Sequence, residues 1–149
     1  MKKKENFYLK NKQGELEFSL LAEGYRKLGL LYVLIQNGVL TQGSILFWDE
    51  PESNLNPKLS HLAVKIIIEL QRMGVQVFLT THDYVLLKEF DLNITSEDEI
   101  CYHSLYHKDD KKDNEIMYST SHDFASISHN AIDETYDYLL NQEINRDLN

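Results

Sequence analysis

Hydrophobic residues are spaced along this chain in two different ways, one typical of helices and the other of buried strands. In residues 26–36 and 59–73 the apolar side chains recur at helical spacing. Ile45–Trp48 is a short continuous apolar run bounded by turn residues, which favours a strand buried on both faces of a parallel sheet, and Val75–Thr80 predicts a second buried strand. Strand, helix and strand within residues 45–80 predict a parallel crossover unit, so the expected fold class is α/β.

The ends of these elements carry matching signals. Asn37-Gly38 is a helix C-terminal signal, and Gly74 ends the second helix in the same way. Asn56 can cap the start of that helix, and Pro57 lies in its first turn, where proline is tolerated.

Weaker patterns flank the crossover unit. Glu15–Phe18 alternates like a short strand. Ile100–His107 and Glu115–Thr120 predict two strands joined by a charged turn at 109–114, and residues 130–148 predict an amphipathic helix. No linker or repeat divides the chain, so residues 1–149 are expected to form a single domain.

Composition narrows the class of protein. The net charge of −9 argues against broad, sequence-independent binding of nucleic acid. We expect contact with nucleic acid only through a larger assembly. Cys101 is the single cysteine and suits a reducing cytosol, so we expect a cytoplasmic protein. No apolar run approaches the ~20 residues of a membrane span, and the N-terminal lysines precede no signal-peptide core.

Chemistry-bearing residues follow both predicted strands. Asp49 and Glu50 come directly after the first, where hard oxygen ligands suit magnesium and a carboxylate can activate water. His82 follows the second, and the carboxyl ends of parallel strands share one edge of a sheet. Upstream, the polar turn Leu21–Tyr25 opens into a helix, whose free N–H groups beside Gly24 can form an anion site.

The ordered motifs LAEGYRKL, ILFWDEPESNLNP and FLTTHD resemble those of ABC-type ATPases, specifically the prokaryotic AAA-family branch akin to the OLD and RecF/SMC-like ATPases. The resemblance covers roughly residues 15–90. It implies a three-layer P-loop NTPase-like sheet that lacks the N-terminal P-loop strand. It also implies ATP and Mg²⁺ as ligands.

The resemblance assigns a role to each matching residue. Asp49 matches the magnesium-side carboxylate of Walker B, Glu50 the catalytic base and His82 the switch histidine. The signature motif, which in the family reaches the ATP of the opposite subunit, matches Leu21, Ala22, Glu23, Gly24 and Tyr25, and the D-loop matches Ser53, Asn54, Leu55 and Asn56. The chain departs from the family at Ala22, where a serine is usual, and at Asn56, where an aspartate is usual.

The phosphate-binding loop of such enzymes is missing, because no segment matches G-x-x-x-x-G-K-[ST]. Three charge-assisted hydrogen bonds from that loop would supply about 5–9 kcal/mol. A micromolar ligand gains about 8 kcal/mol in total. We therefore expect the chain alone neither to bind nor to hydrolyse ATP, and expect a homo- or heterodimer formed through the signature and D-loop. The missing strand would leave an apolar edge beside Val75–Thr80, to be filled by another chain or by Ile100–His107.

Two other functions remain open. The chain could be a non-catalytic module that pairs with a complete ATPase and supplies its signature and D-loop in trans. It could also bind a metal through His103 and His107, or through His122 and Asp123. Asp49, Glu50 and His82 together favour the ATPase fragment over both.

Overall fold

The computed structural model describes residues 8–11, 14–17, 23–108 and 115–148. The chain forms two compact units, Met1–Thr81 and His82–Asn149, and each is described by itself. Both units are mixed α/β, as predicted. A single domain over residues 1–149 stays a prediction.

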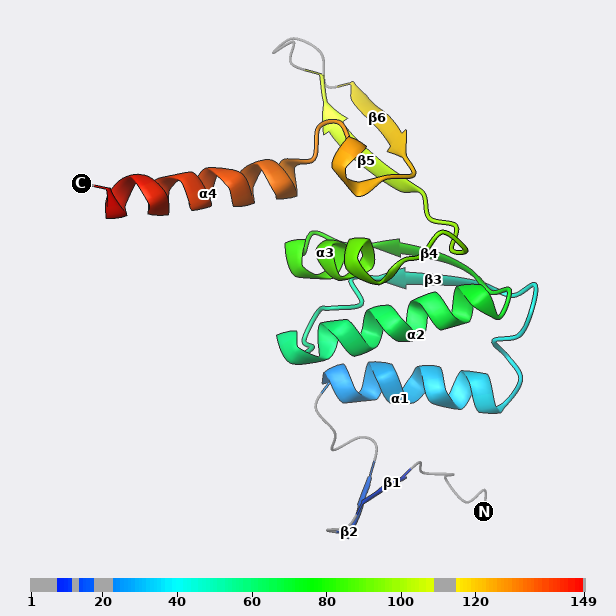
Figure 1. Ribbon diagram of the computed structural model, residues 1–149. Coiled ribbons are helices and arrows are strands. Elements are labelled where there is room, and N and C mark those ends of the chain that lie inside the picture. The colour runs from blue at the N-terminus through cyan, green and yellow to red at the C-terminus, as the bar shows by residue number, and fades with distance from the viewer. Residues whose placement is uncertain (1–7, 12–13, 18–22, 109–114, 149) are drawn as a thin grey trace. The chain divides into compact units, whose positions relative to one another are not determined.

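The first unit contains a β-hairpin and a parallel strand–helix–strand unit (Figure 1). Its elements are β1 (Tyr8–Asn11), β2 (Gly14–Glu17), α1 (Glu23–Gln36), β3 (Ile45–Asp49), the 3₁₀ helix η2 (Pro57–Leu59), α2 (Ser60–Arg72) and β4 (Gln76–Thr80). β1 pairs with β2 antiparallel, and β3 pairs with β4 in parallel. The predicted crossover unit is therefore confirmed, and so is the strand at residues 15–17, whereas Phe18 lies outside the described residues.

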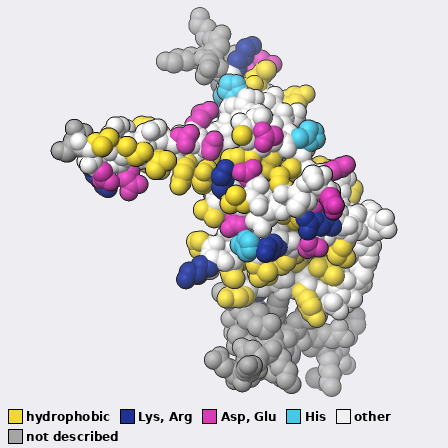
Figure 2. Space-filling view, viewed as in Figure 1, with side chains coloured by type: hydrophobic (Ala, Val, Ile, Leu, Met, Phe, Trp, Pro, Cys, Tyr) yellow, Lys and Arg dark blue, Asp and Glu magenta, His cyan; other side chains and the backbone are white. Residues whose placement is uncertain are grey.

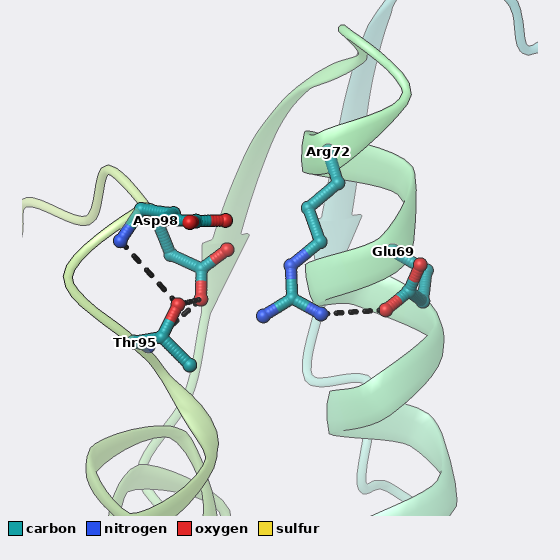
Figure 3. Close-up of polar contacts among 5 residues, drawn as sticks. Glu69, Arg72, Thr95 and Asp98 are labelled. Atoms are coloured by element: carbon teal, nitrogen blue, oxygen red, sulfur yellow. Dashed lines mark hydrogen bonds and ion pairs between the residues drawn. The ribbon is translucent and has the colours of Figure 1, made fainter.

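The predicted helix ends are confirmed by their backbone geometry. Gly38 and Gly74 have φ values of 67° and 84°, in the left-handed region that glycine adopts without a side-chain clash. The Asn56 side chain accepts a hydrogen bond from the Lys58 N–H (3.0 Å) and so caps η2, which leads into α2. In the last turn of α2, Arg72 pairs with Glu69 at 2.7 Å (Figure 3), an exposed pair of small energetic value.

The two faces of the β3–β4 sheet differ in burial. One face packs with α1 and α2 into a core built around Leu31, Leu40, Leu70 and Val75, to which Leu46, Trp48 and Val77 contribute. On the other face, Ile45, Phe47 and Phe78 are exposed, and Phe47 retains 75% of its accessible surface. The rings of Phe47 and Phe78 stack with centroids 5.1 Å apart. The prediction of strands buried on both faces is therefore wrong for the described residues, because within this unit α1 and α2 pack on one face only.

The second unit contains α3 (Tyr84–Asn93), β5 (Tyr102–His107), β6 (Ile116–Ser121), the 3₁₀ helix η3 (Phe124–Ser126) and α4 (Ala131–Asp147). β5 and β6 form an antiparallel pair, as predicted, while the turn at 109–114 lies outside the described residues. β5 pairs with β6 alone, so the described structure gives no support to β5 as the strand that fills the edge of β4. Asp83 caps α3 by accepting from the Leu86 N–H (2.7 Å). After α3, the Asp98 carboxylate accepts from the N–H and hydroxyl of Thr95 (Figure 3).

The interior of this unit contains one unusual polar group. Tyr102 is buried against Phe124, with ring centroids 6.1 Å apart, and Lys88 Nζ lies 4.6 Å from the Phe124 ring. The Tyr102 hydroxyl has no hydrogen-bond partner among the described residues. Loss of water around the phenolate, aided by the charges of Asp91 and Asp123, raises the pKa of Tyr102 to about 12.

α4 confirms the predicted C-terminal helix but buries none of its residues. Tyr136 stacks on Tyr84 of α3 at a centroid distance of 3.9 Å. Hydrophobic side chains, including Leu139, Leu140 and Ile144, are exposed along the helix (Figure 2). No described helix is both long and apolar enough to cross a membrane.

Candidate functional site

The acidic pair lies at the carboxyl end of β3, as predicted. Asp49 is the last residue of β3 and stands opposite Thr80, the last residue of β4. The Thr80 hydroxyl donates to Asp49 Oδ1, which fixes the carboxylate at the end of the sheet. Asp49 is exposed and Glu50 is half-buried. Both carboxylates are therefore placed where a ligand can approach the sheet edge.

The backbone of Glu50 is held in an uncommon conformation. Its φ is 43°, in the left-handed region that costs a non-glycine residue about 1–3 kcal/mol. Its N–H donates to the Thr80 carbonyl (3.1 Å), and its own carbonyl accepts from the Ser53 N–H (3.0 Å) and from Lys27 Nζ (3.0 Å). Contacts from three segments thus fix the direction in which the chain leaves β3.

The loop after Glu50 is anchored through Glu52. Thr81 Oγ1 donates to Glu52 Oε1 at 2.6 Å, while Glu52 Oε2 is buried without a hydrogen-bond partner among the described residues. Farther along, Asn54 also has a positive φ, 61°, and its side chain is exposed. Asn56 is exposed as well, with its Oδ1 engaged in the cap of η2. The loop therefore presents two asparagine side chains to solvent.

The first turn of α1 packs against this loop. Gly24 is buried, and a Cβ added to it would lie 2.6 Å from the Asn54 carbonyl oxygen and 2.9 Å from Leu55 Cδ1. Glycine is thus needed here for the approach of backbone to backbone. Glu23 and Tyr25 are exposed beside it, and Leu21 and Ala22 lie outside the described residues.

Sequence reasoning missed Lys27. It lies one helical turn after Gly24, and it reaches Glu50, 23 residues away in the chain. No local pattern marks a lysine for such a contact. The only signal was its place on the helix that the LAEGYRKL motif opens.

His82 is the first residue of the second unit and is exposed. Its position relative to Asp49 and Glu50 is therefore not described, and its meeting with them stays a prediction. The next residue, Asp83, has a local structural role as the cap of α3.

The donor set at the sheet edge fits magnesium only in part. Asp49 offers a hard carboxylate oxygen, with the Thr80 hydroxyl beside it. Within the described ranges no cluster of three His, Cys, Asp or Glu side chains could hold a metal by itself. Mg²⁺ is usually bound by one or two carboxylates together with water and phosphate oxygens. The described residues give no support to a metal site at His103 and His107, or at His122, whose ring nitrogen contacts the Ile100 carbonyl (2.6 Å).

Comparison with known proteins identifies the family. Residues 6–88, more than half of the chain, match the family model described as "AAA domain, putative AbiEii toxin, Type IV TA system". The chain belongs to this AAA domain family. The macrolide export ATP-binding/permease protein MacB of Chlorobaculum tepidum is 31% identical over 68 residues, which cover 46% of this chain and 10% of that protein. The chain thus spans about a tenth of this relative. No solved structure matches significantly.

Family membership establishes an ATP-binding domain of the AAA/ABC ATPase type at a coarse level. The matched region contains the acidic pair, the described part of the first turn of α1 and His82. It ends within α3, so β5, β6 and α4 lie beyond it.

Proposed function

We propose that this chain is the part of an ABC-type ATPase that supplies the Walker B carboxylates, the signature turn and the D-loop, and that its phosphate-binding loop lies elsewhere. The branch we favour is the OLD and RecF/SMC-like one. The observation that carries the proposal is the position of Asp49 and Glu50 at the end of a parallel strand, with the Glu50 backbone fixed from both sides.

In this proposal the two carboxylates have different roles. Asp49, oriented by the Thr80 hydroxyl, is the magnesium ligand. Glu50, half-buried and on a fixed backbone, orients the attacking water and accepts its proton. Bound ATP-magnesium supplies the phosphoryl group that the water attacks.

His82 is proposed to donate a hydrogen bond to the γ-phosphate. It follows Thr80 by two residues, and two residues of extended chain span at most about 7 Å. Thr80 stands opposite Asp49, and this short separation along the chain supports the proposed role of His82.

The exposed face of the β3–β4 sheet favours the proposal that a segment outside the described residues covers it. Ile45, Phe47 and Phe78 form an apolar surface on the face opposite α1 and α2. Burying a phenylalanine side chain completely contributes about 1.5–3 kcal/mol. A chain segment that carries G-x-x-x-x-G-K-[ST], pairs with the edge beside Val75–Thr80 and covers this face would bring the phosphate-binding loop to the acidic pair.

The contact between Gly24 and the Asn54–Leu55 backbone supports a shared dimer surface. It places the first turn of α1 beside the loop that holds Asn54 and Asn56, so both motifs can face one partner. We propose that the chain forms a homo- or heterodimer through them. The runner-up function is a non-catalytic module that supplies these two motifs in trans.

The test is co-expression with a P-loop polypeptide taken from the coding region directly upstream. We expect a stable complex that binds ATP, and we expect Phe47→Asp to weaken the complex while Val39→Asp, an exposed control outside the sheet, leaves it intact. Failure of the two polypeptides to associate, or the absence of a P-loop upstream, would refute the proposal. If Glu50→Gln in this chain leaves turnover by the complex unchanged, the non-catalytic module is the correct function.

A further inference from the structure

We propose that Lys27 is a positioning residue for Glu50: its ammonium group holds the Glu50 carbonyl and thereby sets the direction of the proposed catalytic carboxylate. This inference rests on the proposed function only for the role of Glu50. The contact itself is a property of the fold, with Lys27 Nζ 3.0 Å from the Glu50 oxygen.

The left-handed backbone at Glu50 explains why an additional contact is needed. An L-residue with φ of 43° relaxes toward negative φ unless its neighbours prevent it. The N–H side is held by the Thr80 carbonyl, which belongs to the same sheet. The carbonyl side is held by Ser53, within the same loop, and by Lys27, from another element. The Lys27 contact thus ties this carbonyl to a helix outside the loop.

The first residues of α1 contact both ends of the loop that follows β3. Lys27 contacts Glu50 at the start, and Gly24, three residues earlier on the same helix, contacts Asn54 and Leu55 near the end. Residues three apart lie on the same side of a helix, so a single helix face spans the loop. Lys27 is half-buried, which limits competition from water for its ammonium group. A displacement of the first turn of α1 would therefore move the Glu50 backbone with it.

Amide hydrogen exchange on the full chain tests the contact without requiring ATPase activity. We expect Lys27→Met to raise exchange at the Glu50 and Ser53 amides about tenfold or more, because a charge-assisted hydrogen bond is lost. Lys27→Arg keeps a charged donor and should stay within about threefold of the wild type. The matched control is Lys65→Met, an exposed lysine on α2, which should leave both amides unchanged.

The location of the faster amide exchange distinguishes a positioning role of Lys27 from a general loss of stability. Lys27→Met should leave the β3–β4 amides, such as that of Phe47, unchanged. A rise of equal size at β3 and at the loop, or no rise at the loop, would overturn the proposal. In the complex with the P-loop polypeptide, Lys27→Met should lower kcat with KM unchanged, and Lys27→Arg should restore kcat. Turnover absent from the wild-type complex would refute the proposed function, while the exchange result would still decide the role of Lys27.

Discussion

Replacing Gly24 with alanine separates two physical effects of opposite sign. In a helix interior, alanine is favoured over glycine by about 0.8–1.0 kcal/mol, which is an upper limit for Gly24, the second residue of α1. At Gly24, however, the new Cβ would lie 2.6 Å from the Asn54 oxygen and 3.0 Å from Leu55 Cα. Both obstacles are backbone atoms, so they cannot rotate away. Overpacking of this kind costs about 1–3 kcal/mol, so we expect Gly24→Ala to destabilise the first unit by about 1 kcal/mol.

Urea unfolding followed by the fluorescence of Trp48 measures this change. Trp48 is the only tryptophan, and it packs against the core on the covered face of β3. The midpoint should fall at an unchanged m-value. Leu55→Ala in the same background removes the Cδ1 contact but not the backbone contacts, so it should not restore stability. A variant that is more stable by about 1 kcal/mol would refute the argument, because helix propensity would then act alone.

Three further predictions concern single side chains. Tyr102→Phe should be more stable by about 1 kcal/mol, because it removes a buried hydroxyl without a partner. The pKa of Tyr102 is about 12 in the folded chain and 10 in the unfolded chain, so the wild type loses stability as the pH rises from 10 to 12. In chemical denaturation, the stability advantage of Tyr102→Phe should therefore grow over this pH range by up to ~1.4 kcal/mol per pH unit. Glu50→Gly should be at least as stable as Glu50→Gln by thermal melting, because glycine adopts a φ of 43° without strain; a less stable glycine variant would contradict the strain argument. Asn56→Ala should cost about 0.5–2 kcal/mol in urea unfolding and Asn56→Asp almost nothing, since aspartate also caps; equal losses would exclude the cap as the cause.

The fold was predictable where local spacing determines structure. The apolar periods of residues 45–80, the glycines at helix ends and the cap at Asn56 all depend on near neighbours, and each prediction was confirmed. α3 was not predicted, because Val85, Leu86 and Leu87 are consecutive apolar residues and give no clear helical period. The exposure of Phe47 could not be predicted, because an apolar run is the same whether one face or both are covered.

The candidate site was predicted in its residue types but not in its contacts. Asp49 and Glu50 lie at the predicted strand end, yet the Lys27 contact depends on how two distant segments pack. Gly24 was expected to allow the approach of an anion. The structure shows the loop backbone at that position, so the glycine also has a packing role. The roles of these residues and of His82 in ATP hydrolysis stay predictions.

ATP turnover by the purified chain shows whether Glu50 needs a phosphate-binding loop from outside this chain. It should be measured with Mg²⁺, for the wild type and for Glu50→Gln, first alone and then in complex with the P-loop polypeptide. Our prediction is that the chain alone shows no turnover, and that the complex shows turnover that Glu50→Gln abolishes. Turnover by the chain alone that depends on Glu50 would contradict it, because the phosphates would then be held without a P-loop.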